Sequence, residues 1–245
     1  MLKILVSPVA FNEHIKLKNA VVRFLAARKN IFSPLDYLIV DDGSTDGTTA
    51  MIESFKDQGV KTIRHPQRSG VGAAIRTAIK YARDHQYDVL VIMAGNDKDN
   101  PEEIPRLLEP IIQHDYDLVQ GSRYLDGGGT GGDMPSYRKF ATRLHPRLFT
   151  FVTGHKMTDT TNGFRAFKLS IFKDERINID QAWLNCYELE PYLLFKSIKL
   201  GYQVKEAPVT KIYPSKKLGY TKMRPLIGWW SILRPLVFLG LGIRK

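Results

Sequence analysis

Cysteine is almost absent from this chain of 245 residues. The single cysteine, Cys186, excludes an internal disulfide framework and fits a reducing compartment. The opening stretch from Met1 to Val6 lacks the length and cleavage site of a signal peptide, so we interpret it as a first strand. Internal repeats are also lacking. The residues are 43% hydrophobic, which predicts a sizeable core in one large domain or in one domain with an added subdomain.

Acidic residues are scarce in the last fifth of the chain. From Lys196 to Lys245 there are eleven basic residues and one acid, Glu206, so this stretch holds +10 of the formal net charge of +11. Such a block favours anionic partners such as phosphates, nucleic acid or an acidic membrane surface, although a solvated basic face is the plainer interpretation. Since no nucleic-acid motif accompanies it, we rank a nucleic-acid partner last and expect none.

The chain ends in an apolar, basic tail, residues 226–245. From Leu226 to Ile243 the tail is apolar except for Ser231 and Arg234, and it is about as long as the shortest membrane spans. An Arg-Pro step interrupts it, and two tryptophans lie near its start beside basic residues, as is typical of the headgroup boundary. We expect interfacial or shallow insertion, ahead of a helix packed on the protein and of a true span.

Strand and helix signals alternate through the first part of the chain. We expect strands over Lys3–Pro8, Asp36–Val40, Val60–His65 and Tyr87–Met93, and helices over Glu13–Arg28, Thr48–Gln58 and Val71–His85. Strands that are separated by helices form right-handed crossovers. The pattern therefore predicts an α/β protein with a mostly parallel central sheet flanked by helices.

The pattern changes after Met93, and the turn-rich segments become longer. We expect helices over Pro101–His114, Arg138–Thr153 and Glu188–Leu200, strand-like segments over Asp117–Gly121 and Gln203–Tyr213, a glycine-dense loop over Tyr124–Asp133, and a compact turn-rich stretch over Asp159–Phe167. Since no sharp linker divides the chain, we expect one continuous domain over residues 1–225, followed by the tail.

The most informative segment is Leu38–Thr49, in which an apolar run ends in two adjacent carboxylates, Asp41 and Asp42. A Gly-Ser-Thr-Asp-Gly turn and a helix-like stretch follow. The carboxyl ends of parallel strands form the edge at which open α/β folds bind ligands, and carboxylates there accept hydrogen bonds from hydroxyl and N–H groups. A well-capped turn, with Thr45 or Asp46 capping the helix, is the plainer alternative.

Seven segments carry a resemblance to a known family through their order and spacing. They are Ser7–Glu13, Val40–Thr48, Gly70–Ala74, Gly121–Tyr124, Asp159–Arg165, Glu206–Val209 and Gly219–Lys222. Over about Lys3 to Met223 the chain resembles the family 2 glycosyltransferases of the GT-A fold, and most of all the dolichyl- or polyprenyl-phosphate sugar synthases. The resemblance implies a nucleotide-binding half at about 1–100 and an acceptor half at about 101–225.

The same resemblance implies a nucleoside pocket. The residues that it places there are Pro8, Phe11, Glu13, Asp41, Asp42 and Gly70. A carboxylate can accept bonds from both ribose hydroxyls. Glu13 by itself would be interpreted as a first-turn helix acid, and a Gly-x-Gly before a helix by itself as a turn. The donor implied is GDP-mannose or UDP-glucose.

Basic residues are predicted to bind and neutralise the phosphate groups that take part in the reaction. We assign the catalytic positions to Arg123, Lys98 and Lys222, and the phosphate-binding acceptor positions to Arg138, Arg165, Lys216 and Thr221. The three arginines match arginines of the polyprenyl-phosphate synthases, and Lys216, Thr221 and Lys222 stand where that family often has an Arg and a Ser-Lys pair. Arginine binds phosphate through planar, bidentate hydrogen bonds, whereas lysine acts as a point charge.

The chain departs from the family at the end of the fourth expected strand. Members of the family usually have Met-Asp-x-Asp there, and the two aspartates hold Mg²⁺ or Mn²⁺ on the diphosphate; here Ala94 and Asn96 occupy those positions, and Lys98 the next. Three interpretations stay open. Asn96, Asp97 and Asp99 could still hold the cation; Lys98 could neutralise the diphosphate directly; or the protein could bind without catalysing.

The implied reaction is the inverting transfer of one sugar to a lipid phosphate, polyprenyl or dolichyl. Because a phosphate is ionised near neutral pH, with a second pKa of about 6, such an acceptor needs no strong protein base. The alternatives are transfer to a soluble hydroxyl, with Glu188 or Glu190 as the base, and a non-catalytic nucleotide-sugar-binding protein. We expect a cytoplasmic protein, peripheral on the cytoplasmic face of an anionic membrane. The sequence makes no prediction of the oligomeric state.

Overall fold

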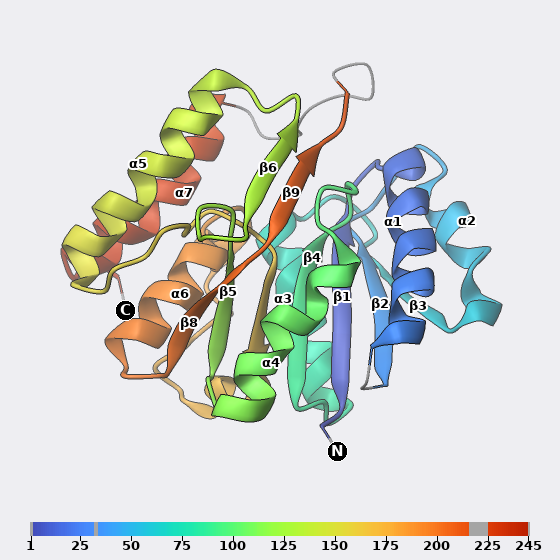
Figure 1. Ribbon diagram of the computed structural model, residues 1–245, viewed down its shortest axis with the longest axis horizontal. Helices are drawn as coiled ribbons and strands as arrows, with labels where there is room; N and C mark the ends of the chain where they lie inside the picture. The colour runs from blue at the N-terminus through green and yellow to red at the C-terminus, as the bar shows by residue number, and fades with distance from the viewer. Residues whose placement is uncertain (1, 32–33, 216–224, 245) are drawn as a thin grey trace.

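A computed structural model of the chain describes residues 2–31, 34–215 and 225–244. Three of the predicted site residues, Lys216, Thr221 and Lys222, lie outside the described residues, so their roles stay predictions. Figure 1 shows the arrangement of the elements.

The first part of the chain alternates strands and helices, as the sequence predicted. The elements are β1 (Ile4–Ala10), α1 (His14–Ala27), β2 (Leu35–Asp41), α2 (Thr48–Glu53), β3 (Val60–Arg64), α3 (Val71–Asp84) and β4 (Val89–Ala94). β1, β2 and β4 are nearly continuous apolar runs because helices cover both faces of the sheet, whereas β3, at the edge, is partly exposed.

The second part is less regular. The elements are α4 (Ile104–His114), β5 (Leu118–Ser122), β6 (Gly129–Gly132), α5 (Ser136–Thr153), β7 (Arg165–Lys168), α6 (Leu189–Lys199), β8 (Val204–Pro208), β9 (Thr210–Tyr213) and α7 (Pro225–Gly240). Two of these strands differ from expectation. β6 lies in the segment expected to be a loop, and β7 closes the segment expected to be turns.

Seven strands of the described residues form the central sheet, in the order β3-β2-β1-β4-β7-β5-β8. All neighbouring strands are parallel except β7, which runs antiparallel to both β4 and β5. β6 and β9 pair in parallel as a separate small sheet. The α/β class with a mostly parallel sheet is therefore confirmed, and the carboxyl ends of β1, β2 and β4 meet at one edge.

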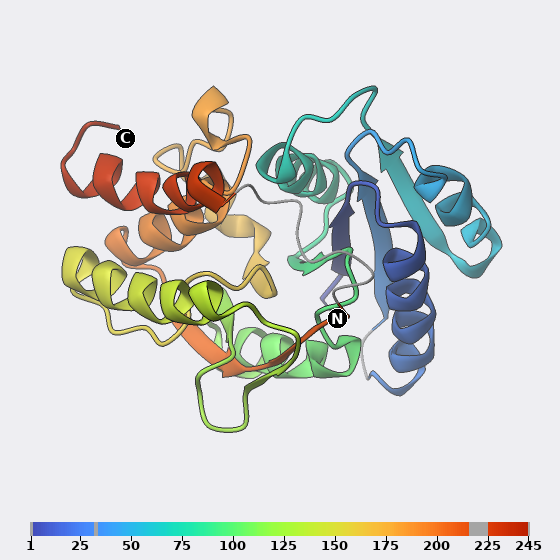
Figure 2. The same ribbon diagram turned by 90° about the horizontal axis from the view of Figure 1, so that it is seen from above.

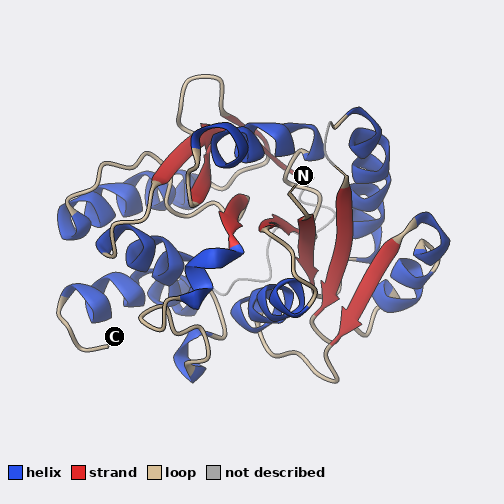
Figure 3. Ribbon diagram, turned by 90° about the horizontal axis from the view of Figure 1, so that it is seen from below, coloured by secondary structure: helices blue, strands red, loops and turns tan. Residues whose placement is uncertain are grey.

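Alternation of side chains along the strands divides the core into two clusters, one on each face of the sheet. On one face Leu5 and Leu90 pack with the apolar side of α3 and with α6. On the other face Val6 and Val91 pack with α1, α2 and α4. Figure 3 shows helices on both sides of the strands.

The tail forms α7, which packs on α5 and α6 in the second half of the molecule (Figures 1 and 2). Leu236 is buried in the core, and Arg234 pairs with Glu188 and donates to the carbonyl oxygen of Trp183 at 2.8 Å. Of the possibilities that the sequence left open, packing on the protein is present. In the described part of the chain, no helix is long and apolar enough to cross a bilayer.

Candidate functional site

A cavity of about 430 Å³ opens at the carboxyl edge of the parallel strands. Its walls come from both halves of the chain: the ends of β1 and β4, the start of α3, and residues of α5, α6, β9 and α7. The cavity therefore lies where the fold class binds ligands, as the sequence predicted.

The two adjacent carboxylates at the end of β2 have different surroundings. Asp41 is fully buried and accepts hydrogen bonds from Ser44 N at 2.9 Å and Thr49 Oγ1 at 2.5 Å, so it holds the turn before α2. Asp42 lines the cavity. Its two oxygens accept from the backbone N–H groups of Ser69 and Gly70, both at 2.8 Å. Asp42 is thus the member of the pair that a ligand can reach.

Gly70 also lines the cavity, and its conformation requires glycine. Its φ is 105°, and an added Cβ would lie 2.4 Å from the carbonyl oxygen of Asn185. The backbone N–H of Gly70 is committed to Asp42. This glycine therefore holds the start of α3 against the carboxylate of Asp42.

An aromatic ring and a carboxylate complete this end of the cavity. The guanidinium of Arg68 lies 4.4 Å from the ring centroid of Phe11, and both residues line the cavity. Glu13 lines it too and pairs with Lys16 at 2.5 Å. Pro8 is buried within β1 and is not part of the cavity lining, which begins at the next residue.

The opposite end of the cavity is cationic. Lys98 is 4% exposed, and its Nζ lies 5.2 Å from the ring centroid of Tyr213; the Arg138 guanidinium lies 5.9 Å from the same ring. Burial, together with the positive charges of Arg138, Lys211 and Lys16, lowers the pKa of Lys98 to about 7. At neutral pH the Lys98 side chain is therefore charged only in part, and an anion bound here would favour its protonated form.

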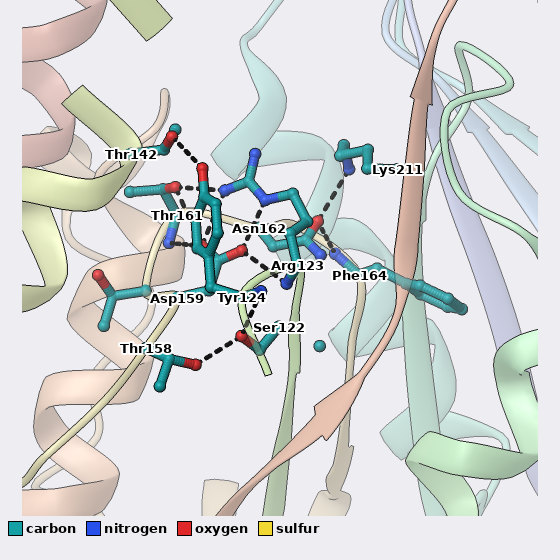
Figure 4. A network of polar contacts seen from close by, with 12 residues as sticks. Ser122, Arg123, Tyr124, Thr142, Thr158, Asp159, Thr161, Asn162, Phe164 and Lys211 are labelled. Carbon is teal, nitrogen blue, oxygen red and sulfur yellow. Dashed lines mark hydrogen bonds and ion pairs between the residues drawn. The ribbon is translucent and has the colours of Figure 1, made fainter. Parts of the chain in front are cut away.

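Arg123 is held in a buried network, which Figure 4 shows. Its Nε and Nη2 donate to the two oxygens of Asp159 at 2.6 and 2.8 Å, its Nη1 donates to Tyr213 at 3.0 Å, and its Nη2 also donates to Thr161 at 2.7 Å. Although burial opposes the charge, the Asp159 carboxylate raises the pKa of Arg123. Arg123 thus contributes to the cavity wall with its guanidinium already bound to protein groups.

Arg165 is likewise committed within the protein. It is fully buried in β7, and its guanidinium donates to the carbonyl oxygens of Glu190 at 2.9 Å and Asn162 at 2.7 Å. It forms part of the cavity lining, as Arg138 does. Of these two arginines, Arg138 on α5 is the one that lies at the cationic end of the cavity, near Lys98.

Two of the three residues predicted as metal ligands form ion pairs with basic side chains of the protein. Asp97 pairs with Arg23 at 2.9 Å, and Asp99 pairs with Lys211 at 2.6 Å; neither residue lines the cavity. Asn96 does line it, and its Oδ1 has no hydrogen-bond partner among the described residues. Across those same residues, no group of three histidine, cysteine, aspartate or glutamate side chains is placed to hold a metal.

Two residues that shape the site had no role assigned to them in the sequence analysis. Lys211 lies two residues after the segment Glu206–Val209, and it reaches the cavity because β9 crosses beside the loop after β4. Glu206 accepts from the backbone N–H groups of Thr158 and Asp159 at 2.8 and 2.7 Å, which fixes the turn that carries the Arg123 partner. Glu206 lies in a motif that the resemblance identified, but its bonding role needed the structure.

Comparison with solved structures establishes the fold. The structure of glucosyl-3-phosphoglycerate synthase from Mycobacterium tuberculosis in complex with Mn²⁺, uridine diphosphate and glucosyl-3-phosphoglycerate superposes with a TM-score of 0.70 at 16% identity, covering 100% of this chain and 81% of that one. The same enzyme in complex with Mg²⁺ and uridine diphosphate gives 0.70 at 14% identity, with the same coverage. At these identities the likeness establishes the fold, which is GT-A.

The family follows from the sequence comparison. The profile of glycosyl transferase family 2 matches residues 9–176, so the chain belongs to this family and is a glycosyltransferase. It is 33% identical to the undecaprenyl-phosphate mannosyltransferase of Micrococcus luteus over 193 residues, 77% of this chain and 75% of that one. It is 30% identical to the polyprenol monophosphomannose synthase of Mycolicibacterium smegmatis over 189 residues, 76% and 69% of the two chains.

Proposed function

We propose that this glycosyltransferase moves one mannose or glucose from GDP-mannose or UDP-glucose to polyprenyl or dolichyl phosphate, with inversion at the anomeric carbon. The observation that carries the proposal is a single cavity with a carboxylate and aromatic end at the sheet edge and a cationic end formed by Lys98, Lys211 and Arg138. The names of the two bacterial relatives, both of which specify a polyprenyl or undecaprenyl acceptor, support it.

The carboxylate end suits the nucleoside. Asp42 already accepts two backbone N–H bonds, and its Oδ1 also lies 2.8 Å from His65 Nδ1, so Oδ2 is the oxygen with a further lone pair that can accept from a ribose hydroxyl. Glu13 offers a second acceptor on the same wall. The ring of Phe11, flanked by Arg68, gives the base an apolar and cationic surface to pack on.

The cationic end suits the two phosphate groups that meet in the reaction. In the proposed step an oxygen of the lipid phosphate attacks the anomeric carbon. The bond from that carbon to the diphosphate breaks, and its electron pair passes to the diphosphate oxygen. No proton has to be removed, because the acceptor phosphate is already ionised at neutral pH. The protein must hold the groups in line and stabilise the leaving charge.

The outer surface of the cavity wall suits a lipid. Five large apolar side chains form one stripe along α5, namely Tyr137, Phe140, Leu144, Leu148 and Phe151. Phe140 is 70% exposed and Phe151 is 88% exposed, and Arg143 and Arg147 are exposed on the same helix. On the neighbouring α7, Trp230 is exposed. We therefore propose that α5 and α7 rest on an anionic membrane surface, on its cytoplasmic face.

Transfer is tested with donors that carry a radiolabelled sugar. The protein is incubated with each labelled donor and polyprenyl phosphate, and the mixture is extracted with organic solvent. We expect label in the organic phase with one of the two donors, and none when the polyprenol without its phosphate is the acceptor. Label confined to the aqueous phase with both donors would contradict the proposal.

A second acceptor class has one observation in its favour. Glu190 lines the cavity, with its Oε1 3.6 Å from Arg165 Nη2, and a carboxylate in this place could deprotonate a soluble acceptor hydroxyl. The variant Glu190→Gln separates the two reactions. Transfer to lipid phosphate should survive it, because that acceptor needs no base, whereas transfer to a hydroxyl should be lost.

Membrane docking is tested by sedimentation with vesicles that contain phosphatidylglycerol. We expect Phe140→Ser and Phe151→Ser to lower the bound fraction, because each removes an exposed apolar side chain from the α5 stripe. Ile112→Ser on α4 is the matched control, since Ile112 is also exposed but lies outside the stripe. Equal binding by all three variants and the unmodified protein would contradict docking through α5.

A further inference from the structure

The loop after β4 offers few carboxylates that could bind a metal ion together with the diphosphate of a donor. Both oxygens of Asp99 are committed, one to Lys211 Nζ at 2.6 Å and the other to the backbone N–H of Ala94 at 2.8 Å. Asp97 pairs with Arg23, outside the cavity. What remains on the cavity wall at this loop is the amide of Asn96. Since Mg²⁺ is usually held by one or two carboxylates besides the phosphate oxygens, this donor set does not fit it.

Two lysines lie on the cavity wall beside this loop. Lys98 and Lys211 both line the cavity, and the positive charge of Lys211 acts on Lys98. Backbone pairing fixes their relative position, because Ile212 N donates to the carbonyl oxygen of Lys98 at 2.9 Å and Asp99 forms a bridge with Lys211. The loop that carries Lys98 and the strand that carries Lys211 are therefore joined by backbone hydrogen bonds.

Among the described residues, the hydrogen bonds of the Lys211 ammonium group use two of its three N–H donors, so one can bind a ligand. An ammonium group has three N–H donors. Two of those on Lys211 have acceptors among the described residues, Asp99 Oδ1 at 2.6 Å and Asn162 Oδ1 at 2.9 Å. The carboxylate of Asp99 thus orients a lysine, in place of coordinating a metal. Asn162 is fully buried, so this orientation is supported from the protein interior.

We infer that Lys98 and Lys211 bind the diphosphate of the donor in place of a divalent cation, so that donor binding and transfer need no added metal. The inference rests on the proposed function, because it assumes a nucleoside diphosphate sugar in this cavity. Lysine neutralises phosphate as a point charge, and charge-assisted hydrogen bonds are the stronger ones. When the bond to the sugar breaks, the same two groups take up the charge that develops on the leaving diphosphate.

Calorimetry with UDP and GDP tests the binding step. For the nucleotide that binds, we expect the same affinity in EDTA as with Mg²⁺ or Mn²⁺. Lys98→Gln should weaken it about tenfold to a hundredfold, as the loss of one charge-assisted hydrogen bond implies, while binding of the nucleoside without phosphates stays unchanged. Lys18→Gln, which removes an exposed charge from α1, is the control and should bind as the unmodified protein does.

Lys211 needs a paired substitution. Lys211→Met alone would leave the carboxylate of Asp99 buried without its cation, so the protein could fail to fold. Lys211→Met combined with Asp99→Asn removes both charges together. We expect this double variant to unfold at a temperature near that of the unmodified protein and to lose diphosphate affinity by about the same factor as Lys98→Gln.

The organic-extraction assay, repeated after chelation, completes the test. We expect transfer to persist in EDTA and to be lost in Lys98→Gln. If the chelated protein binds and transfers only after Mg²⁺ or Mn²⁺ is restored, the inference is wrong and the proposed function stands. If neither UDP nor GDP binds with or without a metal, both are wrong.

Discussion

Replacing Arg123 by methionine should destabilise the whole protein, because its side chain is 2% exposed and its guanidinium pairs with a carboxylate that is fully buried. Arg123→Met leaves Asp159 charged and without its two guanidinium bonds of 2.6 and 2.8 Å. Removing one member of a buried ion pair costs about 3–5 kcal/mol. In a chain of this size each kcal/mol lowers the unfolding temperature by about 2–4 °C. The expected drop is therefore about 6–20 °C.

Thermal unfolding followed by circular dichroism measures this effect. The control is the double variant Arg123→Met with Asp159→Asn, in which no buried charge is left; we expect it to recover part of the lost stability and to show coupling between the two sites. Transfer activity should fall in both variants, because the network also holds Tyr213 and Thr161 at the cavity. An Arg123→Met protein that unfolds at the unmodified temperature would refute the reasoning.

Three further predictions concern stability and donor binding. Burial lowers the pKa of His145 from 6.5 to about 4. The unfolded chain therefore takes up this proton first as the pH falls, and the free energy of unfolding should drop by up to about 3 kcal/mol between pH 7 and 4. His145→Gln, compared by urea titration at each pH, should lack this contribution; an unchanged pH dependence would contradict it. In Gly72→Ala the new Cβ would lie 2.1 Å from the carbonyl oxygen of Leu184. We expect a loss of about 1–3 kcal/mol, and an unchanged urea midpoint would speak against it. Asp42→Asn should weaken the binding of UDP or GDP about tenfold, measured by calorimetry. Asp84→Asn, at an exposed position, is the control. If the two variants bind the nucleotide with equal affinity, Asp42 does not contact the nucleoside.

The sequence predicts the nucleotide side of the fold well because its signals are local. β1, β2 and β4 are short, mostly apolar runs that are bounded by helix patterns, and these runs could be located to within a few residues. The two carboxylates after β2 also point to the ligand edge without any knowledge of tertiary contacts. What the sequence could not separate was their roles, since only the structure turns Asp42 to the cavity and Asp41 to the turn.

The second half was harder to predict because its decisive contacts join distant residues. β7 is four residues long and begins with a buried arginine, so it lacks an apolar strand pattern; it is a strand because β4 and β5 pair with it on both sides. In the same way β6 is a glycine-rich segment that β9 orders. Asp99 and Lys211 are far apart in the sequence, and neither residue signals that it will neutralise the other.

Identification of the product measures the central claim, transfer to a lipid phosphate, most directly. The protein is incubated with GDP-mannose or UDP-glucose and polyprenyl phosphate, the lipid is analysed by mass spectrometry, and the released nucleoside diphosphate is quantified. We predict a polyprenyl phosphate that carries one hexose, formed in equal amount to the nucleoside diphosphate, with one of the two donors. Release of nucleoside diphosphate with an unmodified lipid, or no release with either donor, would contradict the account.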